Sequence, residues 1–219
     1  MKLLIFDTET TGLPKSNQSA LTTPNNWPHI VSISWVIIEN NTIIKQRDYI
    51  IKPENWNIPE DSIKIHGITY EIACNKGHRL QTVMSEFMAE QCDAMVAHNM
   101  NFDYNVIINA IKWDLEFDFK GFNVPMRCTM ILSKPQCKLP GRFGAYKTPK
   151  LKELYEFIFK RKPDENKLHG SLYDTIILTE CIQHCTWLQA ALGLPVSNLP
   201  LNNGIHESKT INFNFKETN

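Results

Sequence analysis

Runs of hydrophobic residues place several β-strands along the chain. The clearest run covers residues 30–38, which are rich in β-branched side chains and interrupted only by Ser32 and Ser34. A turn signal, Glu39-Asn40-Asn41, separates this run from the next, so the two strands are expected to form a hairpin. The strands that the pattern predicts cover residues 2–7, 30–38, 42–52, 94–97 and 124–130.

Apolar positions with a helical period lie between and after these strands. In the segment 80–90, the apolar positions 80, 83, 84, 87 and 88 share one face of a helix. The helices that the pattern predicts cover residues 59–65, 80–90, 101–113, 151–159 and 172–192. Two stretches, 13–29 and 133–149, contain several prolines and no helical period, and are expected to be loops.

The order of these elements predicts an α/β fold. Three strands come first and are followed by alternating helices and strands, which favours a mixed sheet with an antiparallel three-strand part and parallel strands, flanked by helices. We expect one domain over residues 1–192 and an irregular C-terminal tail over 193–219. Ligands of open α/β sheets bind at the carboxyl ends of strands, where Asp7, Glu9 and His98 lie.

Composition is that of an ordinary globular protein. Of 219 residues, 42% are hydrophobic and 21% charged, which excludes disordered, collagen-like and coiled-coil classes for the whole chain. No apolar run approaches the roughly 18 residues that span a bilayer, and no signal peptide is visible, so no membrane partner is expected. The six cysteines lack zinc spacing and are expected to be reduced thiols of a cytoplasmic or other intracellular protein, a viral protein in a host cell included.

Charge is balanced overall but uneven along the chain. The 23 basic and 23 acidic residues argue against nucleic-acid binding by a diffuse basic surface. Residues 134–162, however, contain nine Lys or Arg and only two Glu. This segment either follows a phosphate backbone or forms a solvated loop and helix face, and the sequence leaves both interpretations open.

Paired carboxylates follow the first predicted strand. Asp7 and Glu9 are two residues apart, so their side chains are expected on one face of the strand. Such neighbours repel each other unless they are protonated or bound to a metal ion, and oxygen ligands favour Mg²⁺ or Mn²⁺. Gly12 allows the backbone to turn sharply after them. The tripeptide is common, and on its own it more often marks a polar strand end than a metal site.

Two further acids lie in the first turns of predicted helices. Asp103 follows the strand 94–97, and its helix could be capped by Asn101. Asp174 follows Ser171 by three residues, which resembles a capping box, and His169 precedes both. For either acid taken alone, helix capping and metal binding are both sufficient explanations.

The acids and the histidine together resemble a known family. Residues 6–13, 98–103 and 169–174 resemble the three motifs of the DnaQ-like (DEDDh) 3′–5′ exonucleases, whose fold is ribonuclease H-like. Residues 65–69 resemble a segment common before the second motif. The third motif has the histidine form, because Gly170 stands where the other subgroup has tyrosine. The resemblance covers roughly residues 2–192.

The resemblance implies a role for each matching residue. Asp7, Glu9 and Asp174 would hold one of two divalent cations, Mg²⁺ or Mn²⁺, Asp7 would also reach the second, and Asp103 would support the second. His169 would be the general base that takes a proton from the attacking water. The residues that would contact substrate are Thr8, Leu13, His66, His98, Asn99 and Phe102. Leu13 and Phe102 are also compatible with core packing.

The expected function is therefore a metal-dependent 3′–5′ exonuclease. It would release nucleoside 5′-monophosphates from single-stranded or frayed 3′ ends, of DNA rather than RNA, in proofreading or repair. Since the chain has no room for a polymerase domain, proofreading would need a separate polymerase or replication protein as partner. The alternatives are an exoribonuclease that trims RNA, a silent nucleic-acid-binding module and, more remotely, a structural zinc protein.

Overall fold

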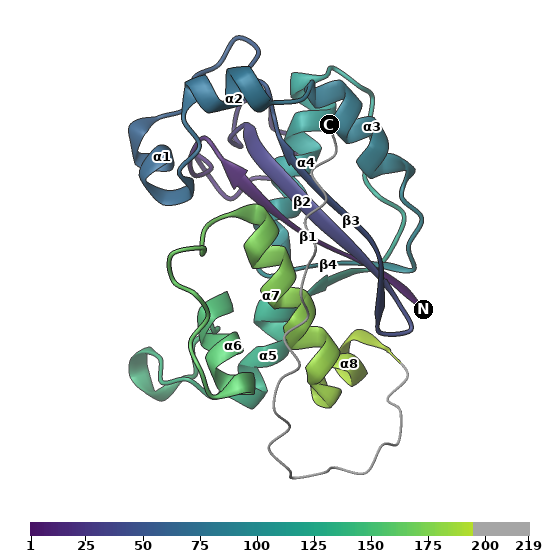
Figure 1. Ribbon diagram of the computed structural model, residues 1–219, viewed down its shortest axis with the longest axis vertical. Coiled ribbons are helices and arrows are strands. Elements are labelled where there is room, and N and C mark those ends of the chain that lie inside the picture. Colours follow the sequence, from purple (N-terminus) through teal and green to yellow (C-terminus); the bar gives the residue numbers. More distant parts are fainter. Residues whose placement is uncertain (195–219) are drawn as a thin grey trace.

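A five-stranded mixed sheet forms the centre of the computed structural model, which describes residues 1–194 (Figure 1). The strand order is β3-β2-β1-β4-β5. β1, β2 and β3 are antiparallel neighbours, whereas β1, β4 and β5 run parallel. The mixed sheet and the predicted hairpin are therefore confirmed. The strands are β1 Lys2–Thr10, β2 Ile30–Glu39, β3 Thr42–Ile50, β4 Ala94–Ala97 and β5 Met126–Cys128.

Helices cover both faces of this sheet. One face packs mainly against α3 and α4, and the other against α6, α7 and α8. A π-helical turn, Ala110–Asp114, continues α4. The helices are α1 Glu60–His66, α2 Tyr70–Lys76, α3 Leu80–Ala89, α4 Met100–Asn109, α5 Thr129–Cys137, α6 Leu151–Phe159, α7 Ser171–His184 and α8 Thr186–Leu192.

The alternation of side chains along β1 assigns its residues to the two cores. Leu4 and Phe6 belong to the core under α3 and α4, whereas Leu3 and Ile5 belong to the core under α7. Because side chains two residues apart share a face, the odd-numbered positions after Ile5 continue toward α7. This periodicity places the two carboxylates of β1 on the α7 side of the sheet.

β1 is longer than the predicted strand 2–7. It continues to Thr10, because the backbone stays paired with β2 through Thr8↔Ile33 and Glu9↔Ser32 before a bulge at Glu9/Thr10. The carboxylates therefore lie within a paired strand rather than on a free loop.

Two other predictions were wrong, and one helix was missed. The expected loop 133–149 is helical as far as Cys137, and α5 includes Pro135, because packing of the buried side chains of this helix outweighs the missing N–H. Helix α2, which has Thr69 as its N-cap, was not predicted. The expected helix 172–192 is broken at Cys185, whose φ of −117° and ψ of 102° are extended.

The predicted C-terminal tail lies almost wholly outside the described residues, since the description ends at residue 194. Within the described part, no helix is both long and apolar enough to span a bilayer.

Phe87 of α3 is expected to be essential for stability. Its side chain is 1% exposed and lies against the rings of Phe6, Trp35 and Phe122, with centroid separations of 5.5, 5.3 and 5.9 Å. Phe87→Ala should lower the free energy of unfolding by about 3–5 kcal/mol, measured by urea denaturation, because it leaves a cavity. The control Phe117→Ala, at a residue that is 57% exposed, should cost less than about 0.5 kcal/mol. Equal effects would contradict this packing.

Candidate active site

Three carboxylates meet where the end of β1 faces the first turn of α7. One carboxylate oxygen from each of Asp7, Glu9 and Asp174 lies within 4.8 Å of the others. All three side chains are partly exposed, so the cluster is open to solvent. The sequence prediction that these acids lie together is confirmed, and the spacing of two residues in β1 is the reason that two of them share a face.

A chain of hydroxyl groups holds the first turn of α7 against β2. The Ser171 Oγ lies 2.9 Å from the Ser32 Oγ and 2.8 Å from the Ser34 Oγ. Since Ser34 donates to Asp48 Oδ1 at 2.7 Å and each hydroxyl has one proton, Ser32 donates to Ser171, which donates to Ser34. This chain positions the helix turn that carries Asp174.

The predicted capping box at the start of α7 is absent. Gly170 is the N-cap and no side chain caps it, because the Ser171 hydroxyl bonds to β2 instead. Sequence reasoning missed this role of Ser32, Ser34 and Ser171. The two serines that interrupt the apolar strand were the available signal, but their partner lies 139 and 137 residues away.

Asp103 is held by the strand from the other side of the sheet. Its Oδ1 accepts hydrogen bonds from the Thr8 backbone N–H at 3.1 Å and from the Thr8 hydroxyl at 2.8 Å. Asp103 is 3% exposed and is not part of the three-carboxylate cluster. Helix α4 begins after Asn99, which has a left-handed φ of 83°, so the predicted cap Asn101 is wrong.

All four acids hold their protons more tightly than isolated carboxyls do. Burial, then the charges of Asp103, Asp174 and Glu9, raise the pKa of Asp7 well above its usual value. Burial raises the pKa of Glu9 to about 8, and the pKa values of Asp103 and Asp174 to about 7. Hydrogen bonds from Thr8 oppose the shift at Asp103, and one from the His169 backbone opposes it at Asp174.

The carboxylate cluster fits a hard divalent cation. The Asp174 Oδ1 is buried and has no hydrogen-bond partner among the described residues. Together with the oxygens of Asp7 and Glu9, it offers the ligand type that Mg²⁺ and Mn²⁺ prefer. A bound cation would remove the repulsion that raises the pKa values of these acids.

His169 lies on the loop that leads into α7. It is exposed and has a positive φ of 63°, which is uncommon for a residue other than glycine. Only Gly170 separates it from the helix that carries Asp174. The imidazole is therefore carried by the residue that lies five positions before Asp174 in the sequence.

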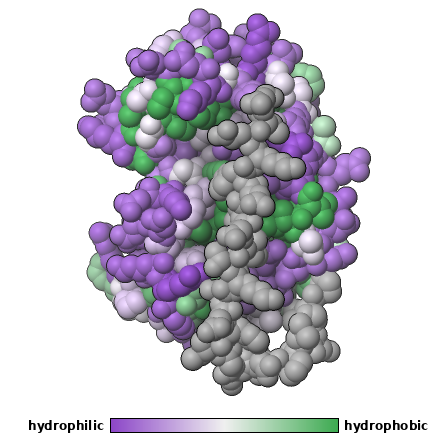
Figure 2. Space-filling view, viewed as in Figure 1, coloured by the Kyte–Doolittle hydropathy of each residue, from purple (hydrophilic) through white to green (hydrophobic). Residues whose placement is uncertain are grey.

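Apolar side chains are exposed near the end of β1. Leu13, just after the strand, is 84% exposed, while Ile65 of α1 and Tyr70 of α2 are 58% and 46% exposed. Figure 2 shows hydrophobic surface in the region of α1 and α2. Phe102, in contrast, is half-buried and lies edge-on to Trp27, with ring centroids 5.9 Å apart.

The two histidines expected near substrate have different surroundings. The His66 Nδ1 accepts a hydrogen bond from the Ile68 N–H at 3.1 Å, and burial lowers the pKa of this ring although the Thr10 backbone opposes the shift. The His66 Nε2 is buried near Thr10 without a hydrogen bond of good geometry in the described structure. The exposed Asn99 follows His98 directly.

His98 has both ring nitrogens occupied by protein atoms. Its Nε2 donates to the Pro149 carbonyl at 2.9 Å, and its Nδ1 accepts from the Thr129 hydroxyl at 3.0 Å. Burial lowers its pKa to about 4, so the ring is neutral at pH 7. These bonds join the end of β4 to the start of α5 and to the segment before α6.

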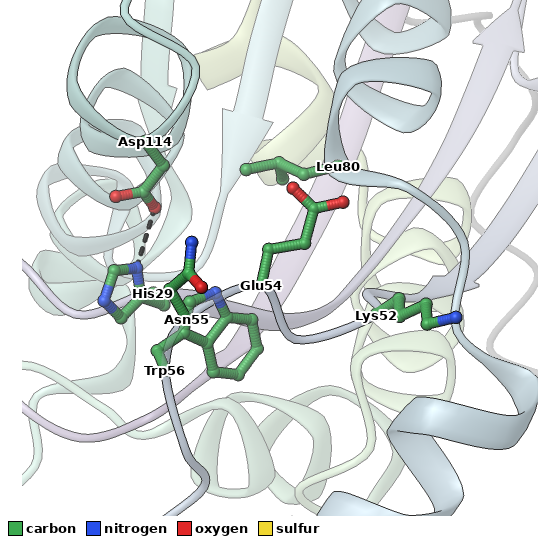
Figure 3. Close-up of a pocket in the computed structure, with 7 residues that line it drawn as sticks. All are labelled: His29, Lys52, Glu54, Asn55, Trp56, Leu80 and Asp114. Atoms are coloured by element: carbon green, nitrogen blue, oxygen red, sulfur yellow. Dashed lines mark hydrogen bonds and ion pairs between the residues drawn. The ribbon is translucent and has the colours of Figure 1, made fainter.

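A cavity of about 190 Å³ lies outside the acidic cluster (Figure 3). Its His29 side chain lies 2.9 Å from Asp114 and stacks on Trp56. The His29 backbone bonds to Thr11 in both directions, at 3.0 and 3.1 Å. None of the four acids lines this cavity, and its contacts fix the turn that presents Leu13.

Comparison with solved structures shows what this fold is similar to. Exonuclease X in complex with 5′ overhanging duplex DNA has a TM-score of 0.58 at 22% identity, over 89% of this chain and 95% of that chain. Exonuclease I of E. coli in complex with a dA16 oligonucleotide has a TM-score of 0.61 at 14% identity, over 87% of this chain and 42% of that chain. Exonuclease I from Methylocaldum szegediense has a TM-score of 0.63 at 14% identity, over 86% of this chain and 40% of that one.

Sequence comparisons are consistent with this fold. The PolC-type DNA polymerase III of Thermotoga maritima is 33% identical over 138 residues, and that of Thermotoga petrophila is 31% identical over the same length. The match covers 62% of this chain but only 9% of each polymerase. The sequence model of the exonuclease family matches residues 4–181. The chain therefore belongs to the DnaQ-like exonuclease family, which has the ribonuclease H-like fold.

Proposed function

We propose that this protein is a metal-dependent 3′–5′ exonuclease that releases nucleoside 5′-monophosphates from single-stranded or frayed 3′ ends. The observation that carries the proposal is the cluster of Asp7, Glu9 and Asp174, whose raised pKa values and buried unpaired oxygen suit a divalent cation. Phosphodiester hydrolysis requires such neutralisation, because charge accumulates on the phosphate oxygens.

Two Mg²⁺ or Mn²⁺ ions are proposed to bind here. Asp7, Glu9 and Asp174 would hold one, Asp7 would also reach the second, and Asp103 would support the second. When bound, the ions would neutralise the phosphate and lower the pKa of the attacking water. Thr8 orients Asp103 through two hydrogen bonds, and Ser171 fixes the turn that carries Asp174.

His169 is proposed to be the general base. An imidazole whose ordinary pKa is about 6.5 can accept a proton from water at neutral pH. Its exposed position allows the proton to pass on to solvent after each turnover. The left-handed backbone at this residue is unfavourable for local stability, which is consistent with a functional role for His169.

The terminal nucleotides are proposed to lie near the end of β1. The exposed Leu13 is suited to wedge against a base, and Phe102 presents the part of its ring that Trp27 leaves uncovered. Asn99 and His66 border the same end of the sheet. Since His98 is occupied by Thr129 and Pro149, we assign it to positioning this end of β4 rather than to direct contact with substrate.

DNA is the proposed substrate, and a polymerase the proposed partner. Solved relatives of the same fold are described with DNA, and the curated relatives are DNA polymerases. This likeness supports the proposed role in proofreading or repair. RNA trimming is the competing function, and the 2′-hydroxyl of the substrate distinguishes the two.

Degradation of 5′-labelled oligonucleotides tests the proposal. Single-stranded DNA incubated with Mg²⁺ or Mn²⁺ should give a ladder that shortens from the 3′ end, and EDTA should abolish it. Asp7→Ala should reduce the rate at least about a thousandfold, because one carboxylate serves both ions. The rate on RNA of the same sequence measures the preference for DNA over RNA. No ladder on either polymer, or normal activity of Asp7→Ala, would contradict the proposal.

Replacement of His169 should separate catalysis from metal binding. His169→Ala should lower kcat about 100- to 10,000-fold, the usual contribution of a general base, and leave Mn²⁺ affinity unchanged. Single-turnover kinetics and Mn²⁺ titration measure the two quantities. A parallel loss of Mn²⁺ affinity would identify His169 as a ligand or a structural residue instead.

Without divalent cations, the protein should become less stable as the pH rises. In the folded state Asp103 and Asp174 keep their protons up to about pH 7 and Glu9 up to about pH 8, whereas unfolded carboxyls lose theirs near pH 4. The folded state therefore binds more protons between these values, and the free energy of unfolding should fall across this range.

Urea denaturation between pH 5 and about pH 8 measures this effect. Mn²⁺ should restore stability at the upper pH, and Asp7→Asn should flatten the dependence because it removes one group that holds its proton in the folded state and loses it on unfolding. Stability that rises with pH in EDTA would rule out the assigned carboxylate repulsion.

A further inference from the structure

A short hairpin projects between α5 and α6. Residues 138–147 form it, with an antiparallel bridge between Pro140 and Tyr146. The Gly141 N–H donates to the Ala145 carbonyl at 2.8 Å, and the Lys147 N–H donates to the Leu139 carbonyl at 3.0 Å. Figure 1 shows this segment extending beyond α6. The 138–147 hairpin is therefore an ordered projection with its own backbone hydrogen bonds.

The tip of the hairpin presents an aromatic ring to solvent. Phe143 is fully exposed, at 104%, more than any other large hydrophobic residue in the described part of the chain. Its φ of 55° is left-handed, which is unfavourable for a bulky side chain. Neither feature helps the protein to fold, so the ring is available to a ligand.

Positive charge surrounds this ring. Residues 119–152 contain eight Lys or Arg and no Asp or Glu, although the whole chain has 23 of each kind. Lys138 and Arg142 form no ion pair with any residue that the structure describes, whereas Lys147, at the base of the hairpin, is paired with Glu153, and Lys120, at the start of the segment, with Asp118. The free cations and the exposed ring lie on the same projection.

The base of the hairpin is attached beside the candidate active site. The Pro149 carbonyl, two residues after the hairpin, accepts the hydrogen bond from His98. His98 follows β4 and directly precedes Asn99, the N-cap residue of the helix that carries Asp103. The same ring bonds to Thr129 at the start of α5, so the chain is attached to this edge of the sheet both before α5 and after the hairpin.

We propose that the 138–147 hairpin binds the single-stranded nucleic acid upstream of the 3′ end that is being hydrolysed. Phe143 stacks on a base, while Arg142 and Lys138 contact phosphates. An exposed aromatic ring among unpaired cations is the combination that binds single strands without sequence preference. The inference rests on the proposed function, and it implies that the hairpin acts on long substrates and not on very short ones.

Binding to oligothymidylates of about 4 and about 20 nucleotides tests this inference. Fluorescence anisotropy in the Asp7→Asn background avoids degradation during the measurement. Phe143→Ala should weaken affinity for the longer oligomer about tenfold and leave that for the shorter one unchanged, because stacking on one upstream base is lost. Arg142→Ala should reduce the slope of log K against log salt by about 0.7, the value for one phosphate contact on a single strand.

Matched variants serve as controls. Phe117→Ala removes another exposed aromatic ring, and Lys76→Ala another exposed cation, both outside the segment 119–152. Neither control should change affinity for either oligomer. Circular dichroism and urea denaturation should show that Phe143→Ala folds with unchanged stability, since its ring has no packing partner to lose.

The outcomes separate this inference from the proposed function. Unchanged affinity of Phe143→Ala for the longer oligomer would overturn the inference even if the wild-type protein degrades DNA. A change in sedimentation without a change in affinity would assign the ring to contact with a second copy of the chain and would also overturn it. If Phe143→Ala weakens binding to the longer oligomer but the wild-type protein shows no metal-dependent degradation, the result would support the hairpin surface and refute the exonuclease proposal.

Discussion

Repulsion between four acids at one edge of the sheet is the constraint on which the site depends. Asp7, Glu9 and Asp174 share one cluster, and the charge of Asp103 adds to the repulsion that Asp7 experiences. Burial raises the pKa values of all four acids, and neighbouring charges raise those of Asp7, Glu9 and Asp103 further, so the acids are only partly ionised at neutral pH in the absence of a cation. A bound divalent ion would offset this unfavourable arrangement.

The surrounding structure keeps the acids together despite this repulsion. Continued pairing of β1 with β2 fixes the strand through Glu9, and the hydroxyl chain through Ser171 fixes the first turn of α7 to β2. Thr8, which points to the opposite face, holds Asp103 with two hydrogen bonds. The hydrophobic cores on both faces therefore support a site whose acids come from a strand and two helices.

Local sequence patterns were sufficient for some features and not for others. The spacing of Asp7 and Glu9 predicts their shared face, because strand periodicity is a local property. The partner of Ser32 could not be predicted, since Ser171 lies 139 residues away and only the fold brings the two together. Pro135 was misleading because packing of α5 outweighs its local preference. The exposure of Phe143 likewise depends on the hairpin around it rather than on its own position in the sequence.

Titration of the protein with Mn²⁺ by calorimetry tests the central claim most directly. Measurements at about pH 7, in two buffers with different ionisation heats, give both the affinity for the ion and the number of protons released. The account predicts saturable binding that releases protons, because Glu9, Asp103 and Asp174 titrate near this pH, and it predicts much weaker binding by Asp174→Asn. Absence of saturable binding, or binding that is equally tight in Asp174→Asn and releases no protons, would contradict it.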